Sequence, residues 1–170
     1  RQDAARYFPE LAAAPADWLR AASAIVDGEV VALDEAGNAD FSLLQDRTGL
    51  KGLGIHRGDH RPGGDGATER PRAPLVYQVF DLLYLDGRSL LSVPLEDRKR
   101  LLRRVVRDTP SVRYLTHIDA DGEDLHAAAA AHGVEGIIAK LRRSTYDPGK
   151  RSRAWLKIKI RQEQELVVVG

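Results

Sequence analysis

Two lysines late in the chain are spaced to hold an anionic group. Lys157 and Lys159 lie in the segment 155–160, where apolar and basic residues alternate. A period of two predicts a β-strand with both lysines on one face. Their side chains would lie about 7 Å apart along the strand. Like charges at that distance repel unless water screens them or an anion lies between them. The pattern therefore indicates either a solvated strand edge or an anion site.

Positive charge is concentrated in the same part of the chain. From Lys140 to Arg161 there are nine basic residues and one acidic residue, a net charge of +8. The whole chain is only +1, so the other residues together carry −7. Such a concentration suggests a polyanionic partner, although an exposed pair of strands with a solvated loop has the same composition. The basic residues of the segment that follows Lys140 are Arg142, Arg143, Lys150, Arg151 and Arg153.

A second alternating segment precedes this basic stretch. Residues 134–140 include Glu135, Gly136 and Lys140 among apolar residues, which predicts a strand beside 155–160. By the period of two, Glu135 and Lys140 lie on opposite faces of this strand unless a bulge intervenes. The two segments are therefore expected to form a hairpin-like pair.

The remaining segments mix strands and helices. The apolar and aromatic run 75–85 suits a buried central strand. Residues 95–106 predict an amphipathic helix with acids before bases, as the helix macrodipole favours. Further strands are expected at 112–118, at 165–169 and at 24–33, where two pieces are bent at Asp27-Gly28. Further helices are expected at 8–14, 41–47 and 123–132. A surface loop is expected at 52–74.

Length and composition indicate one globular domain. A chain of 170 residues, 43% hydrophobic and 30% charged, can build a single core. The absence of cysteine excludes disulfides and thiolate chemistry and is consistent with a cytoplasmic protein. No apolar run approaches the roughly 20 residues that a membrane span needs. Paired strands with single helices predict an α+β fold, with mainly antiparallel sheets and flanking helices.

Six stretches occur in the order of the motifs of a known family. They are ARYFPEL at 5–11, DGEVVALD at 27–34, FSLLQDR at 41–47, YQVFDLLYLDG at 77–87, EGIIAK at 135–140 and WLKIK at 155–159. The second, fourth, fifth and sixth resemble motifs III, IIIa, IV and V of the covalent nucleotidyltransferases, in particular of ATP-dependent DNA ligases. The chain is most similar to the ligase domain of bacterial non-homologous end-joining ligases. Each motif alone is weak, and their order and separations make the resemblance specific.

The resemblance implies a partial adenylation domain, a nucleotidyltransferase fold of the ATP-grasp-like DNA ligase type, over 1–170. In that family a lysine attacks ATP, AMP passes to a DNA 5′-phosphate, and a 3′-hydroxyl displaces it to seal a nick. Every step is attack on phosphorus, where negative charge must be neutralised. By resemblance, Lys157 and Lys159 contact the α-phosphate, and Lys140 is a further phosphate contact.

The resemblance also assigns the acids, the base platform and the DNA contacts. Glu135 would be the motif IV acid, and a carboxylate beside a phosphate site requires Mg²⁺ or Mn²⁺ between them. Glu29 would bind the AMP ribose or assist that metal, and Phe80 would stack on adenine, although a strand aromatic is often simply a core residue. Nonspecific contacts to DNA phosphates are expected from Arg142, Arg143, Lys150, Arg151 and Arg153.

One departure from the family pattern concerns the nucleophile. The family uses a lysine in a Lys-x-Asp-Gly motif, and none of the six lysines, at 51, 99, 140, 150, 157 and 159, precedes x-Asp-Gly. We therefore expect this chain alone not to adenylate itself. We expect residues 1–170 to form a partial adenylation domain, and residues 161–170 to begin the link to an OB-fold domain.

The implied parent is a bacterial, cytoplasmic and nucleoid-associated repair ligase. Its partners would be nicked or broken double-stranded DNA, the OB-fold domain, the segment with the nucleophile, and end-joining repair proteins. Two alternatives stay open at this point. One is an RNA ligase or a capping-type nucleotidyltransferase, which shares the lysyl-nucleotide chemistry. The other is a nonenzymatic DNA-binding remnant that keeps the fold and the basic hairpin.

Overall fold

The computed structural model describes residue 5 and residues 7–13, 16–48, 73–119, 121–131, 136–150 and 152–160. Most of the expected loop at 52–74, the expected strand at 165–169 and the expected link at 161–170 lie outside this range. The same is true of two candidate site residues, Glu135 and Arg151.

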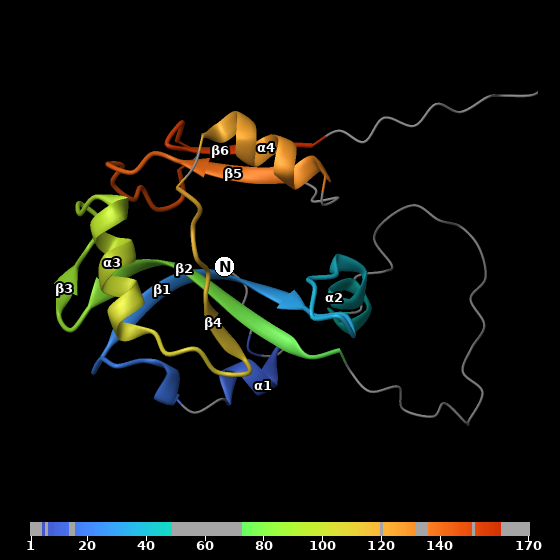
Figure 1. Ribbon diagram of the computed structural model, residues 1–170. Coiled ribbons are helices and arrows are strands. Elements are labelled where there is room, and N and C mark those ends of the chain that lie inside the picture. The colour runs from blue at the N-terminus through green and yellow to red at the C-terminus, as the bar shows by residue number, and fades with distance from the viewer. Residues whose placement is uncertain are drawn as a thin grey trace, which may run out of the picture.

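The larger of the two sheets in the described structure has four strands (Figure 1). Its strands are β1 (Ala24–Ala32), β2 (Leu75–Leu85), β3 (Arg88–Ser89) and β4 (Val112–Tyr114). The central strand β2 pairs antiparallel with β1 and β3 and parallel with β4. The predicted central strand at 75–85 is thus confirmed with the same bounds, as is the mainly antiparallel α+β architecture.

Strand β4 is shorter than the strand expected at 112–118. It ends at Tyr114, and the apolar residues beyond it lie at the surface, with Leu115 39% and Ile118 68% exposed. Because these side chains do not reach the core, the alternation in the sequence does not extend the strand.

Strand β1 is one continuous strand and not the two pieces expected from the sequence. The expected bend at Asp27-Gly28 is instead a shift in register: Asp27 lies opposite Asp81, whereas Gly28 lies opposite Val79. The intervening residue, Phe80, is therefore the extra residue of a β-bulge in β2. A bulge bends the strand and redirects a side chain.

Two glycines allow close approaches within the sheets. A Cβ at Gly28 would lie 2.6 Å from the Tyr77 ring, and a Cβ at Gly136 would lie 2.5 Å from the Ile158 carbonyl oxygen. Both distances are shorter than real contacts, so only glycine fits at these two positions without a shift of neighbouring atoms.

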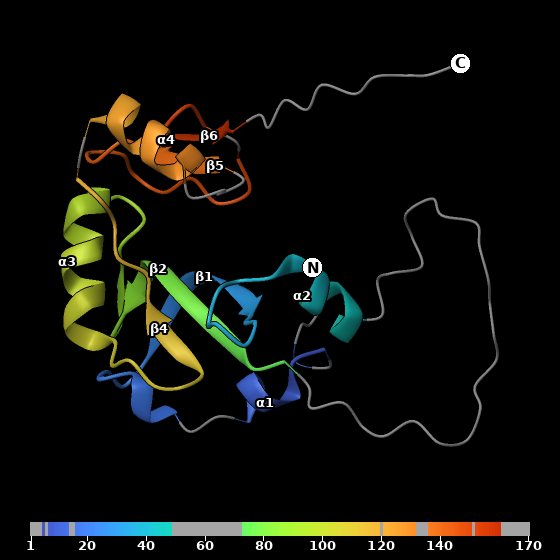
Figure 2. The same ribbon diagram turned by 45° about the vertical axis from the view of Figure 1, so that its right-hand side comes forward.

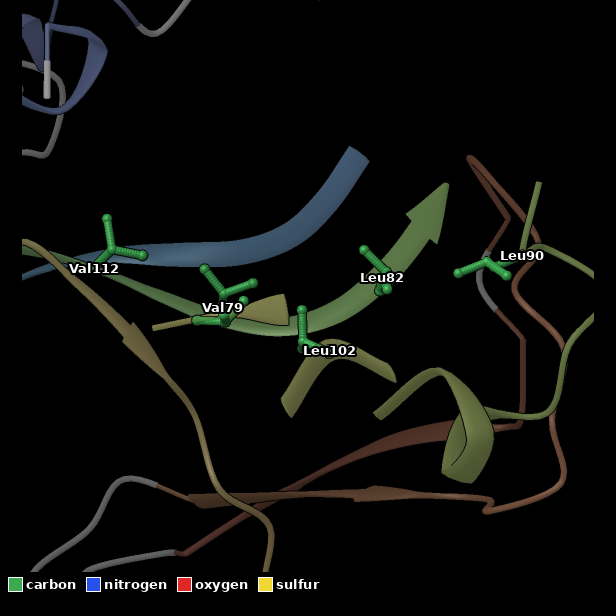
Figure 3. Close-up of a cluster of buried hydrophobic side chains, with 6 residues drawn as sticks. Val79, Leu82, Leu90, Leu102 and Val112 are labelled. Carbon is green, nitrogen blue, oxygen red and sulfur yellow. The ribbon is translucent and has the colours of Figure 1, made fainter. Parts of the chain in front are cut away.

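Helix α3 (Leu95–Val105) packs on β2 and contributes Leu102 to the core. Its Leu102 is fully buried and points toward Val79 and Leu82 of β2 (Figure 3). Val112, at the start of β4, belongs to the same cluster. The amphipathic helix predicted at 95–106 is confirmed.

The other helices are short. They are α1 (Pro9–Ala12), the 3₁₀ helix η1 (Ala16–Trp18), α2 (Phe41–Thr48) and α4 (Gly122–Ala131). A carboxylate oxygen of Asp40 accepts hydrogen bonds from the first-turn amides of α2, at 2.7 Å and 3.2 Å, which is the N-terminal capping role. In the part of the chain that the structure describes, no helix has the length and apolar character to cross a bilayer.

A second, two-stranded sheet lies beside the first (Figures 1 and 2). Strand β5 (Gly136–Lys140) pairs antiparallel with β6 (Trp155–Lys159), so the predicted hairpin-like pair is confirmed. The described part of β5 begins one residue after Glu135. Helix α4 leads into this sheet and lies near it in both views.

The connection between β5 and β6 docks on the first turn of α3. Pro94, the residue before the helix, provides no side-chain cap. Instead the amide of Leu95 donates to the carbonyl of Ser144 at 2.9 Å, and the amide of Glu96 donates to the carbonyl of Arg142 at 3.0 Å. Amides that helices commonly leave unpaired are thus satisfied by a segment distant in sequence. Because α3 packs on β2, this contact links the β5–β6 sheet to the four-stranded sheet.

Candidate functional site

The lysines predicted from the sequence share one face of the β5–β6 sheet. The register pairs Lys140 with Trp155, so these two side chains lie on the same side. The period of two along β6 places Lys157 and Lys159 on that side as well. This face is turned toward the larger sheet, because the ring centroids of Trp155 and Phe80 are 5.9 Å apart. The structure thus places Lys140, Lys157 and Lys159, which the sequence nominated, on the face that meets Phe80 through Trp155.

Lys140 is held between two aromatic rings. Its Nζ atom lies 3.6 Å from the centroid of Trp155 and 4.1 Å from that of Phe80, which are cation–π distances. Burial lowers the pKa of Lys140 to about 8, and the positive charge of Lys99 adds to that effect. The ammonium group therefore contacts the aromatic platform directly, and its expected role as a phosphate contact stays a prediction.

Phe80 lies at the bulge in β2. It has no partner in β1, and its ring meets that of Trp155 in the second sheet. Tyr146 extends the aromatic cluster, with its ring centroid 6.1 Å from that of Trp155 in an edge-to-face arrangement. Trp155 and Tyr146 were not among the candidate site residues nominated from the sequence. For Trp155 the signal was present, because it precedes the alternating lysines.

Tyr146 also links the connection between β5 and β6 to β1. Its hydroxyl donates to Asp27 Oδ2 at 2.8 Å. Burial and this hydrogen bond raise the pKa of Tyr146 to about 12. Asp27 therefore holds the connection in place. Glu29, the nucleotide or metal contact expected from the sequence, lies exposed on β1 opposite Gln78.

A buried ion pair lies beneath the cluster. Arg98 of α3 and Asp81 of β2 are both fully buried, and two nitrogens of Arg98 bind the two carboxylate oxygens at 2.8 Å and 2.9 Å. The remaining nitrogen of Arg98 donates to the carbonyls of Val93 and Ser144. This arginine therefore ties helix, strand and connection together. A sequence that places several arginines in one helix does not reveal which of them is buried.

The basic residues of the connection are exposed, as polyanion contacts must be. Arg142, Arg143, Lys150 and Arg153 are all at the surface. Arg142 forms an ion pair with Asp119, so part of its charge is already compensated. Arg151 is not among the described residues.

A metal ion held by protein groups alone does not fit the described residues. They contain no group of three or more histidines, cysteines, aspartates and glutamates that could hold one. Magnesium, however, is often held by one or two carboxylates together with substrate phosphates. Exposed Glu29 fits that kind of ligand, and Glu135, the other candidate, lies outside the described residues.

Comparison with known sequences identifies the family. The family described as "ATP dependent DNA ligase domain" matches residues 1–159, so the chain belongs to that family. The multifunctional non-homologous end joining protein LigD of Mycobacterium bovis is 36% identical over 169 residues, which cover 99% of this chain and 19% of that protein. A DNA ligase of Methanothrix thermoacetophila is also 36% identical, over 99% of this chain and 29% of its own length. The chain thus spans less than a third of these relatives.

Solved structures give the same result for the fold. The ligase domain of LigD from M. tuberculosis superposes with a TM-score of 0.56 at 33% identity, covering 80% of this chain and 37% of that one. A mycobacterial DNA ligase D complexed with ATP and MES gives a TM-score of 0.57, also at 33% identity, over 80% of this chain and 38% of that one. The predicted nucleotidyltransferase fold and the predicted family are confirmed.

Proposed function

We propose that this chain is the nucleotide-holding and DNA-contacting part of an ATP-dependent DNA ligase, which seals DNA nicks or breaks through lysyl-AMP and DNA-adenylate intermediates. In this proposal it acts with a segment that carries the Lys-x-Asp-Gly nucleophile and with an OB-fold domain. Similarity to end-joining proteins named LigD supports a role in break repair. The names of the relatives favour DNA over RNA as the nucleic acid.

One observation carries the proposal. The face of β5–β6 that bears Lys157 and Lys159 is turned toward the Phe80 ring. An aromatic ring beside paired cations suits a nucleoside phosphate, because the base stacks on the ring while the phosphate meets the cations. Phe80 would hold adenine, and Lys157 and Lys159 would neutralise the α-phosphate.

The first test measures AMP binding to this chain by isothermal titration calorimetry. Stacking of a base on an aromatic ring is worth about 1–3 kcal/mol, so Phe80→Leu should raise the Kd for AMP by about 5- to 150-fold. Phe41→Leu is the matched control, because Phe41 is 71% exposed on α2. Equal affinities for both variants and the unmodified chain would make Phe80 an ordinary packing residue.

A second measurement separates phosphate contacts from base contacts. A hydrogen bond to a charged group contributes about 1.5–3 kcal/mol, so Lys159→Met should weaken AMP binding by about tenfold or more. Adenosine carries no phosphate, so its affinity should not change. If AMP and adenosine weaken equally, Lys159 supports the fold and does not contact phosphate.

Magnesium or manganese would be held by Glu29 and Glu135 together with nucleotide phosphates. When bound, the metal would neutralise phosphate charge. The test compares the Kd for ATP with and without Mg²⁺: Glu29→Gln should reduce the gain from Mg²⁺ and leave the Kd without metal unchanged. An unchanged gain would remove Glu29 from the proposal.

The exposed arginines and lysines of the connection would contact DNA phosphates. The association constant falls as salt rises, and each such contact makes the slope of log K against log salt concentration more negative by about 0.9. Arg143→Ala should therefore make the slope for nicked duplex DNA less negative by about one. Arg107→Ala, an exposed residue just beyond α3, is the control that should leave the slope unchanged. An unaltered slope for Arg143→Ala would exclude that contact.

The chain alone should form no covalent AMP adduct with α-labelled ATP and Mg²⁺. No lysine in the sequence lies in the nucleophile motif. Lys157 and Lys159 would act as cations, and a protonated amine has no lone pair with which to attack. Label that migrates with the chain in denaturing electrophoresis, at a yield comparable to that of an intact ligase, would contradict this assignment.

A further inference from the structure

Two neighbouring cations of α3 both turn into the protein. Arg98 is fully buried and Lys99 is only 8% exposed. Consecutive residues of a helix point in directions about 100° apart, so both can be buried only where two separate partners receive them. Here Arg98 binds Asp81 of β2, and Lys99 meets the backbone carbonyls of Leu115 and Phe80. Phe80 and Asp81 are adjacent residues at the bulge of β2.

Lys99 binds the backbone of the bulge. Its Nζ atom donates to the carbonyl of Leu115 at 3.0 Å and lies 3.5 Å from the carbonyl oxygen of Phe80. The ammonium group also lies 4.9 Å from the centroid of the Tyr114 ring. Lys99 thus bridges the segment after β4 and the bulge residue of β2.

Arg98 fixes the next residue. Asp81 receives two hydrogen bonds from Arg98, and one of its carboxylate oxygens accepts a third from the Leu82 amide at 2.8 Å. An extra residue in a bulge has lost its partner in the regular ladder, so its backbone needs another restraint. In this protein, α3 restrains both the carbonyl of Phe80 and the side chain of Asp81.

We propose that Lys99 is a positioning residue that holds the bulge carbonyl of Phe80 and thereby sets the direction in which the Phe80 ring presents itself to a nucleotide base. The inference rests on the proposed role of Phe80 as the base platform. In this role Lys99 acts through the backbone, since its ammonium group lies against backbone carbonyls and the Tyr114 ring.

The first experiment measures the Kd for AMP of this chain carrying Lys99→Met. Methionine keeps an unbranched apolar stem and removes the ammonium group together with its contacts to the carbonyls of Leu115 and Phe80. The Kd should rise by about fivefold, as expected when the hydrogen bond that restrains Phe80 is lost. Arg103→Met is the matched control, because Arg103 is an exposed cation of the same helix that also contacts the Tyr114 ring, at 5.4 Å. It should leave the Kd within about twofold.

A double-variant cycle asks whether the effect passes through the Phe80 ring. In the Phe80→Leu background, Lys99→Met should produce no further loss of AMP affinity, because the platform it positions is gone. An equal loss in both backgrounds would overturn the proposal, since it would indicate a general effect on the fold.

A fluorine NMR signal reports the ring position directly. The sequence contains three phenylalanines, so a chain labelled with 4-fluorophenylalanine gives three resonances, and Phe80→Leu identifies that of position 80. Lys99→Met should shift or broaden this resonance and leave those of Phe8 and Phe41 in place. An unchanged Phe80 resonance would contradict the proposal.

The outcomes separate this inference from the proposed function. If Phe80→Leu leaves AMP binding unchanged, the proposed base platform is wrong. If Phe80→Leu weakens binding and Lys99→Met does not, only the positioning role is wrong. Should Lys99→Met fail to fold, Lys99→Gln, whose shorter arm cannot reach the carbonyl, replaces it. Failure of both variants to fold would assign Lys99 to stability and overturn the proposal.

Discussion

Replacing Arg98 by methionine should destabilise the protein more than replacing any exposed arginine of α3. The substitution keeps part of the apolar stem but leaves the carboxylate of Asp81 fully buried without its ion-pair partner. Breaking a buried pair on one side typically costs about 3–5 kcal/mol, because the remaining charge is uncompensated. Domains of this size are stable by about 5–15 kcal/mol, so the variant should lose a large share of its folding free energy.

The carbonyl partners of Arg98 explain why the loss is not purely electrostatic. Arg98 also donates to the carbonyls of Val93 and Ser144, and an unsatisfied buried polar group costs about 1–3 kcal/mol. The double variant Arg98→Met, Asp81→Val removes the buried charge but not this second cost. Its stability should therefore lie between those of the unmodified chain and the single variant.

The assay is urea unfolding followed by far-UV circular dichroism, with the free energy of unfolding extrapolated to water. Arg100→Met is the matched control, because Arg100 lies on the same helix and pairs with Asp97 at the surface. Exposed pairs contribute about 0–1 kcal/mol. A loss below about 1 kcal/mol for Arg98→Met, or a double variant less stable than the single one, would refute the reasoning that the pair is a buried, coupled unit.

Three further predictions concern the second sheet. Tyr146→Phe removes the hydrogen bond to Asp27 and should lower the free energy of unfolding by about 0.5–1.5 kcal/mol; no loss in urea titration would mean that the bond is replaced by water. Gly136→Ala should separate β5 from β6, because the added Cβ meets the Ile158 carbonyl oxygen, and faster amide exchange confined to this sheet is the expected signature. Lys140 has a folded-state pKa of about 8, below its ordinary value of 10.5, so the unfolded chain binds more protons between these values and stability should rise as the pH increases from about 8 to 10. Thermal unfolding measured from about pH 8 to pH 10 should show stability rising with pH in the unmodified chain and rising less in Lys140→Met. The same dependence of stability on pH in both proteins would exclude a buried Lys140.

The sequence predicted the elements that are determined by residues near one another in the chain. The run at 75–85 combines apolar and β-branched residues, and it is β2 with the same bounds. Asp40 caps α2 because its carboxylate reaches amides only two and three residues away. The alternation at 155–160 gave the shared face of Lys157 and Lys159, since a period of two is a property of the strand itself.

The contacts that shape the candidate site are not local. Tyr146 and Asp27 are 119 residues apart in sequence, and Arg98 and Ser144 are 46 apart. The bulge at Phe80 depends on the register between β1 and β2, which alternation within one strand does not determine. Sequence reasoning could therefore nominate Phe80 and the lysines through the family resemblance. It could not find the groups that hold them in place.

The capping of α3 by the connection between β5 and β6 makes two amide protons natural reporters of motion. First-turn amides of a helix commonly exchange quickly with solvent, because nothing within the helix accepts their hydrogen bonds. Those of Leu95 and Glu96 are bonded to Ser144 and Arg142 instead, so they become free only when the connection lifts away. Where reclosing is slow, their exchange rate should equal the opening rate of the connection. Where reclosing is fast, it should equal the opening equilibrium constant multiplied by the intrinsic exchange rate of a free amide. Any ligand that draws the two sheets together would slow exchange at both positions without touching either residue.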